Sequence, residues 1–112
     1  MIKTIIIDDE QHCIKALLSD LQKNCPAIQV LEACNSAKAG IMAIKKYNPD
    51  LIFLDVEMPW MNGFEMLEVF GEVNFSIIFT TAHDEFAAKA FRISAVDYLL
   101  KPIDAHDLKE AV

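Results

Sequence analysis

The stretch Leu51–Gly63, LIFLDVEMPWMNG, decides the fold. Its first four residues are apolar, and the run ends abruptly in an acid, Asp55. Residues that break the chain direction follow, namely Met58, Pro59, Asn62 and Gly63. A short apolar run bounded by turn signals is typical of a strand buried on both faces. Open α/β sheets bind ligands outside the carboxyl ends of their strands, so Asp55 is the first candidate for chemistry. The alternative is that Asp55 only caps the next helix or a turn.

The rest of the chain alternates similar apolar runs with stretches of helical periodicity. Strands are predicted at Ile2–Ile7, Ile28–Cys34, Leu51–Leu54, Ser76–Thr81 and Val96–Leu100. Helices are predicted at Gln11–Cys25, from an N-cap at Ser36 to Tyr47, at Gly63–Phe70, at Asp84–Ser94, and from a cap at Asp104 to the end of the chain. This alternation predicts an α/β fold, a doubly wound five-stranded parallel sheet in the flavodoxin-like order 2-1-3-4-5. We expect the 112 residues to form one domain, with a last helix that is still running at Val112.

Composition narrows the possible functions. The balance of 10 basic against 17 acidic residues gives a net charge of −7, which argues against nucleic-acid binding by this segment. No apolar run approaches the ~20 residues of a membrane span, and the first residues show no signal-peptide pattern. Cys13, Cys25 and Cys34 form no CxxC pair, which favours reduced cytoplasmic thiols, and no zinc site is visible.

Acids and two partner residues are expected to converge at one edge of the sheet. Strands 1 and 3 are neighbours in the predicted order, so Asp8, Asp9 and Asp55 lie together where these strands end. Three carboxylates repel one another, and an oxygen-only ligand set of this kind suits Mg²⁺. With the metal present, a carboxylate can attack phosphorus and form an aspartyl phosphate. Thr81 and Lys101 end strands 4 and 5, and they offer a hydroxyl and an ammonium group in the same layer.

Each of these residues also has an ordinary interpretation. Asp8 and Asp9 alone would be a favourable charge pair at a helix start. Thr81 alone is typical of a strand, and Lys101 alone is typical of a solvated surface. The whole set, with Asp55, at the ends of four strands is hard to explain as an accident.

On these residues, the chain resembles the receiver domain of a two-component response regulator over its full length. The resemblance is carried by Asp8-Asp9, by Asp55 followed by Met58-Pro59 and Gly63, by Thr81-Ala82 and by Lys101-Pro102. The stretch FTTAHDEFAAKAFRISAVDYLLKPI further resembles receivers that precede LytTR-type (LytR/AlgR-like) DNA-binding domains.

The resemblance implies a role for each acid of the site. Asp55 would be the phosphoacceptor, taking a phosphoryl group from a histidine kinase. Asp9 and Asp55 would bind Mg²⁺ directly, Asp8 largely through water, and Glu57 through its main-chain carbonyl. The bond between Lys101 and Pro102 is usually cis in the family, which we expect here too.

The resemblance also implies residues that respond to phosphorylation. Lys101 and Thr81 would hold the phosphoryl oxygens. The switch would move Thr81 toward the phosphoryl group and turn Tyr98 inward, a local charge event that biases a two-state surface. Glu57 and His83 match positions that tune the lifetime of the phosphoryl group.

We therefore expect a cytoplasmic phosphoprotein that takes part in two-component phosphorelay signal transduction and in transcription regulation. We expect it to turn over no external substrate. An output domain outside these 112 residues would bind DNA, and the receiver would dimerise through helix 4, strand 5 and helix 5. Three rivals stay open. A phosphohydrolase similar to the haloacid dehalogenases would carry Asp-x-Asp rather than adjacent acids. A flavin-binding domain of similar topology would need a hydroxyl-rich phosphate loop after the first strand, whereas that loop is acidic here. An interaction module of the same fold would work without phosphorylation.

Overall fold

A parallel five-stranded sheet forms the centre of the molecule. The computed structural model describes residues 1–82, 95 and 97–112. The strands are β1 (Ile2–Ile7), β2 (Ile28–Cys34), β3 (Leu51–Asp55), β4 (Ser76–Thr81) and β5 (Asp97–Leu100). They pair in parallel in the order β2-β1-β3-β4-β5, which confirms the predicted fold class and strand order.

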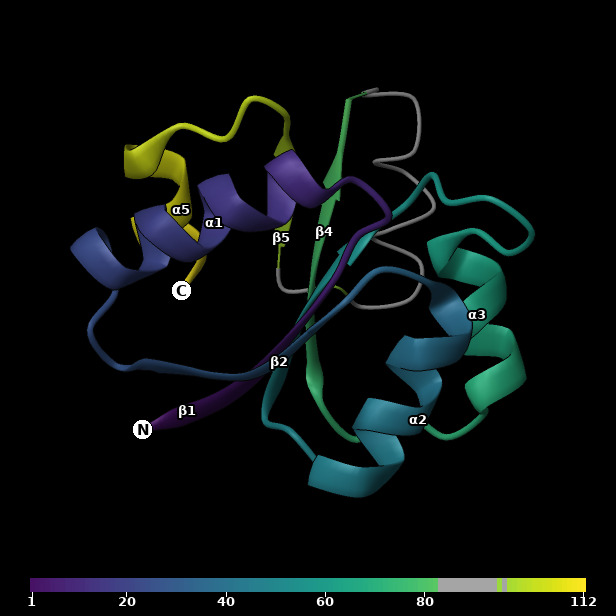
Figure 1. The fold of residues 1–112 in the computed structure, drawn as a ribbon. Coiled ribbons are helices and arrows are strands. Elements are labelled where there is room, and N and C mark those ends of the chain that lie inside the picture. Colours follow the sequence, from purple (N-terminus) through teal and green to yellow (C-terminus); the bar gives the residue numbers. More distant parts are fainter. Residues whose placement is uncertain (83–94, 96) are drawn as a thin grey trace.

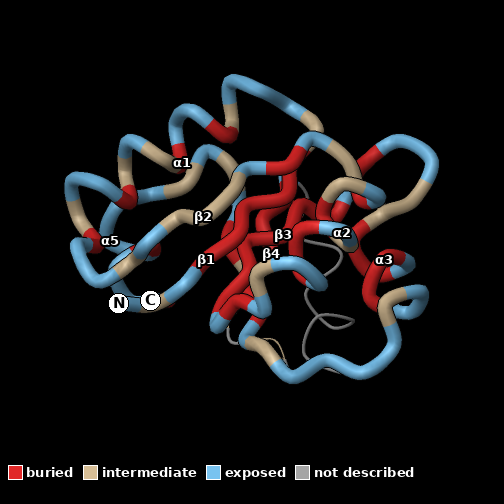
Figure 2. The backbone as a smooth tube through the Cα atoms, turned by 60° about the horizontal axis from the view of Figure 1, so that its bottom comes forward, coloured by how far each residue is buried: buried red, intermediate tan, exposed pale blue. Residues whose placement is uncertain are grey.

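Helices cover both faces of this sheet. Two of them, α1 (Gln11–Asn24) and α5 (Ala105–Ala111), lie on one face. The other two described helices, α2 (Ala37–Tyr47) and α3 (Gly63–Phe70), lie on the opposite face (Figure 1). The strands are therefore enclosed, and most of their residues are buried (Figure 2).

The alternation of side chains along each strand divides the core into two layers. Ile5 and Ile7 of β1 pack with α2 and α3, whereas Ile6, between them, packs with α1 and α5. In β3, Ile52 and Phe53 divide between the two layers in the same way. Because both faces of a central strand pack against helices, its side chains must be apolar on both faces. The continuous apolar run at the start of β3 predicted this.

Side-chain caps fix where the helices begin. The Ser36 hydroxyl accepts a hydrogen bond from the Ala39 N–H at 3.1 Å, and Asp104 accepts from the His106 N–H at 2.7 Å, as predicted for both caps. At α3 the cap is reciprocal. Asn62 accepts from the Glu65 N–H at 2.8 Å, and the Glu65 carboxylate accepts from the Asn62 N–H at 3.0 Å.

Most predicted bounds agree with the structure, and three shift by one residue. The last helix, predicted to run through Val112, ends at Ala111. The first helix ends at Asn24 rather than Cys25, whose N–H caps it on the Leu21 carbonyl. Strand β3 continues to Asp55, which pairs with Thr80. The predicted helix Asp84–Ser94 and residue Val96 of the predicted fifth strand lie outside the described residues.

Candidate functional site

The register of the sheet brings two acids side by side. Ile7 of β1 pairs with Leu54 of β3, so the residues that follow, Asp8 and Asp55, lie at the same carboxyl edge. Both residues are almost fully buried, with exposed fractions of 4% and 3%. A buried carboxylate loses much of its hydration, so two such groups together need positive charge nearby.

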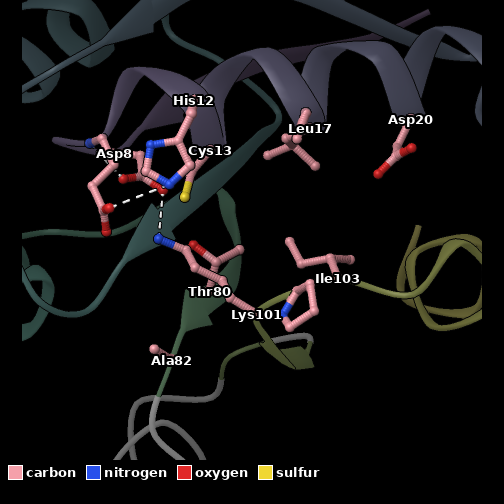
Figure 3. Close-up of a pocket in the computed structure, with 12 residues that line it drawn as sticks. Asp8, His12, Cys13, Leu17, Asp20, Thr80, Ala82, Lys101 and Ile103 are labelled. Atoms are coloured by element: carbon pink, nitrogen blue, oxygen red, sulfur yellow. Dashed lines mark hydrogen bonds and ion pairs between the residues drawn. The ribbon is translucent and has the colours of Figure 1, made fainter.

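Lys101 supplies that charge from the end of β5. Its Nζ lies 2.8 Å from Asp8 Oδ2 and 3.4 Å from Asp55 Oδ2. The backbone N–H of Lys101 donates to the Thr81 carbonyl at 2.7 Å, which fixes the end of β5 against β4. Figure 3 shows the lysine reaching along the cavity wall toward Asp8.

Burial has a large effect on the protonation of this cluster. It raises the pKa of Asp55 to about 7, and the neighbouring Asp8 carboxylate adds to the rise, whereas the Lys101 ammonium opposes it. Burial alone would lower the pKa of Lys101, but its hydrogen bond to Asp8 and its attraction to Asp55 outweigh that effect and raise it. The lysine is therefore charged across the physiological range.

The third acid, Asp9, has an orphaned oxygen. Its Oδ1 is buried and has no hydrogen-bond partner among the described residues. Asp8, Asp9 and Glu10 offer carboxylate oxygens that lie within 4.8 Å of one another. A buried oxygen without a donor in an acidic cluster fits a ligand for a hard divalent cation, and Mg²⁺ takes such oxygens.

The other predicted site residues differ in how close they lie to the cluster of Asp8, Asp55 and Lys101. Thr81 is fully buried at the end of β4. Glu57 is exposed, and its N–H donates to Asp55 Oδ1 at 3.3 Å. Tyr98 is half-buried in β5 and packs against the core layer of α2 and α3. The predicted tuning residue His83 lies outside the described residues.

Gly63 contributes to the site through close packing, which the sequence did not predict. A Cβ at this position would lie 2.7 Å from the Asp55 carbonyl oxygen and 3.1 Å from Leu54 Cγ. The Gly63 N–H donates to the Val56 carbonyl at 2.8 Å. The glycine thus lets the start of α3 approach the strand end that carries Asp55. The Lys101–Pro102 peptide bond is cis, as expected.

A cavity of about 520 Å³ opens beside the cluster, toward α1. Its walls come from α1 and from the chain after β5, and they include Cys13, Leu17, Lys101 and Ile103 (Figure 3). Sequence reasoning missed this cavity because the apolar residues of α1 were assigned only to the core. The acid run that continues from Asp9 into Glu10 was the one available signal.

Fold and site together define a doubly wound α/β domain with two buried acids and a lysine at the carboxyl edge of its sheet, and comparison with known proteins gives its family. The family model of the response regulator receiver domain matches residues 4–112, so the chain belongs to this family. It is 42% identical to the transcriptional regulatory protein BtsR of Escherichia coli K12 and 38% identical to an uncharacterized response regulatory protein of Yersinia pestis. Both matches cover 100% of this chain and 47% of the relative, so the chain spans about half the length of these relatives.

Solved structures show the same fold. The receiver domain of AraT from Geobacillus stearothermophilus superposes with a TM-score of 0.86 at 29% identity, covering 97% of this chain and 88% of that one. The response regulatory domain of mrkE from Klebsiella pneumoniae superposes with a TM-score of 0.87 at 24% identity, covering 97% and 90%. Among the described residues, no helix has the length and apolar character needed to cross a membrane.

Proposed function

We propose that this receiver domain accepts a phosphoryl group from a histidine kinase on Asp55, with Mg²⁺ bound beside the acceptor. The observation that carries the proposal is the position of Asp55. Its carboxylate is buried at the end of β3, with a second acid, Asp8, next to it and the Lys101 ammonium 3.4 Å away. An anionic nucleophile held beside a fixed cation is suited to phosphoryl transfer, which requires mainly positioning and charge stabilisation.

In the proposed reaction, an oxygen of the Asp55 carboxylate attacks the phosphorus of a phosphohistidine. A phosphorus–oxygen bond forms, the phosphorus–nitrogen bond breaks, and its electron pair returns to the imidazole. The Lys101 ammonium, which contacts Asp55 before transfer, is within reach of a phosphoryl oxygen afterwards. The Thr81 hydroxyl, at the end of the neighbouring strand, is proposed to bind another phosphoryl oxygen.

The metal is proposed to bind the carboxylates of Asp9 and Asp55 directly, Asp8 through water, and the main-chain carbonyl of Glu57. The orphaned Asp9 Oδ1 supports this assignment, because a bound cation would give that buried oxygen a partner. A bound Mg²⁺ supplies positive charge that offsets the charge of the phosphoryl oxygens.

Phosphorylation is proposed to change the surface around β5. In this proposal Thr81 moves toward the phosphoryl group, and Tyr98 turns inward from its half-buried position. The same event would favour a homodimer through β5, α5 and the predicted helix Asp84–Ser94. Glu57 and His83 are proposed to set the lifetime of the phosphoryl group.

We propose no turnover of an external substrate, in contrast to a phosphohydrolase. The relation to a transcriptional regulatory protein supports a DNA-binding output domain outside these residues, and the LytTR type remains a prediction, as does a cytoplasmic location.

Intact mass after incubation with acetyl phosphate tests the proposal. We expect one added phosphoryl group in the wild type with Mg²⁺, and none without the metal or in Asp55→Asn. Asp50→Asn, a change in an exposed acid at the opposite end of β3, is the matched control and should be phosphorylated normally. A folded, Mg²⁺-binding wild type that gains no phosphoryl group would favour the phosphorylation-independent interaction module.

A further inference from the structure

Three side chains of different chemistry meet at the start of α1. Glu10 is the N-cap residue of this helix, and His12 and Cys13 lie in its first turn. One carboxylate oxygen, one imidazole nitrogen and the Cys13 sulfur lie within 4.8 Å of one another. Figure 3 shows the His12 ring beside the Cys13 sulfur, and both residues line the cavity.

The distances within this cluster approach those of a zinc site. Zinc lies about 2.0–2.2 Å from nitrogen and oxygen ligands, so two such ligands of a tetrahedral ion are about 3.4 Å apart. His12 Nε2 lies 3.4 Å from Glu10 Oε2. The chain has a second pair with the same 3.4 Å separation, His106 with Glu110, but no cysteine accompanies it in any potential metal-binding group of the described residues. The thiol therefore distinguishes the first cluster from an ordinary surface ion pair.

We propose that Glu10, His12 and Cys13 bind a thiophilic divalent cation of the Zn²⁺ class, at a site that adjoins the proposed magnesium site but uses neither Asp9 nor Asp55. Sulfur and imidazole ligands favour zinc over magnesium, which prefers oxygen. Three protein ligands leave one position for water, as in zinc sites that keep an open position. The adjoining cavity of about 520 Å³ has room for that water.

Anionic groups at the cluster can balance the charge of such an ion, and they must do so beside the Lys101 ammonium, which also contacts the Cys13 thiol. A thiolate and a carboxylate together balance its two positive charges, and both anions are favoured at the N-terminus of a helix. Burial raises the pKa of the Cys13 thiol, and the carboxylates of Asp8 and Glu10 add to the rise, whereas Lys101 opposes it. The cation is therefore expected to displace the thiol proton as it binds.

Titration of the full chain with Co²⁺, a spectroscopic substitute for Zn²⁺, tests the site. Excess Mg²⁺ keeps the oxygen-only site occupied, and the thiolate-to-cobalt charge-transfer band reports coordination by cysteine. Competition with Zn²⁺ then gives the zinc affinity. The variants are Cys13→Ser and His12→Asn, with His106→Asn as the matched control for loss of a paired surface histidine. Circular dichroism of each variant establishes that it is folded.

We expect a band that saturates at one equivalent of Co²⁺ and disappears when Zn²⁺ is added. Cys13→Ser should abolish the band, His12→Asn should weaken zinc binding at least about tenfold, and His106→Asn should leave both unchanged. A wild type without the band would overturn the proposal. So would a band that survives in Cys13→Ser, which would place the metal on another cysteine. Unchanged zinc binding in both Cys13→Ser and His12→Asn would also overturn it and would place the metal on carboxylates alone. Because binding is measured without phosphorylation, the result is independent of the proposed role of Asp55.

Discussion

The ammonium group of Lys101 lies 2.8 Å from Asp8 and 3.4 Å from Asp55, so its shorter contact is not with the proposed phosphoacceptor. Asp8 thus holds the lysine in place, while Asp55 shares its charge over a longer distance. This arrangement leaves the Asp55 carboxylate close to a cation without a short ion pair that a phosphoryl donor would have to break.

The first prediction concerns the stability cost of the Asp55 charge. Because the pKa of Asp55 is raised from 3.8 to about 7, the folded protein binds more protons than the unfolded chain between these values. The contribution of this group to stability is therefore present at low pH and is lost as pH rises toward 7. Without metal, Asp55→Asn should nearly match the wild type at pH 4 and exceed its free energy of unfolding at pH 8 by on the order of 4 kcal/mol.

Urea denaturation in the presence of a chelator measures this difference across pH. Glu72→Gln, which neutralises an exposed acid, should show no such dependence. A wild type that is as stable as Asp55→Asn at pH 8 would show that the buried, charged Asp55 carboxylate does not destabilise the fold, which would contradict the prediction.

The second prediction concerns Lys101. Lys101→Met removes the cation shared by two buried carboxylates, and we expect it to lower the free energy of unfolding at pH 8 by about 3 kcal/mol. In an Asp55→Asn background the loss should be smaller, because only Asp8 then remains charged. A double-mutant cycle by urea denaturation measures the coupling. Exposed Lys38→Met is the control, and equal losses in both backgrounds would mean that Lys101 does not interact with Asp55.

The third prediction compares two glycines. Gly63→Ala should destabilise the fold by about 2 kcal/mol and slow phosphorylation, because the new methyl group would press on the Asp55 carbonyl. Gly71 has a φ of +91°, and apart from its chain neighbours no atom of the described residues lies within 4 Å of the place that a Cβ would take. Gly71→Ala should therefore cost about 1 kcal/mol through its backbone alone. Thermal unfolding and phosphorylation rates check both variants. A Gly71→Ala protein that is phosphorylated as slowly as Gly63→Ala would show that general destabilisation explains the effect.

The fourth prediction concerns the metal. Mg²⁺ at 100 times its dissociation constant should stabilise the wild type by about 2.7 kcal/mol. Asp9→Asn removes the charge of the ligand with the orphaned oxygen, so most of this stabilisation should vanish. Thermal unfolding with and without Mg²⁺ measures it, with exposed Glu68→Gln as the control. Full stabilisation of Asp9→Asn would exclude Asp9 from the metal site.

The fifth prediction ranks the three thiols. Cys25 and Cys34 are buried, and burial together with the Glu32 carboxylate raises the pKa of Cys34 to about 12. Cys13 is the most exposed of the three, so iodoacetamide at pH 8 should modify it first. Peptide mass analysis over time gives the order, and prior modification of Cys34 would contradict the described packing.

Local sequence patterns were sufficient to predict the order of strands and helices along the chain. Apolar runs with turn signals located the strands, and helical periodicity gave Gly63–Phe70 with its observed bounds. The convergence of Asp8 and Asp55 followed from strand order alone, because parallel strands end at the same edge. These features depend on backbone topology, which periodicity encodes.

Features that depend on side-chain placement between elements were not accessible in the same way. No spacing rule says that Lys101 approaches Asp8 more closely than Asp55, since that depends on how the end of β5 packs. The same limit applies to Glu10, His12 and Cys13. Their spacing matches no familiar zinc motif, and the sequence indicated no zinc site, yet the first turn of α1 brings their ligand atoms together.

The central claim is that Asp55, rather than another acid of the cluster, carries the phosphoryl group. The most direct test is borohydride reduction of the phosphorylated wild type, which converts an aspartyl phosphate to homoserine, followed by peptide mass analysis. We predict homoserine at position 55 only. Homoserine at position 8 or 9, or a phosphorylated protein with none at position 55, would contradict the account.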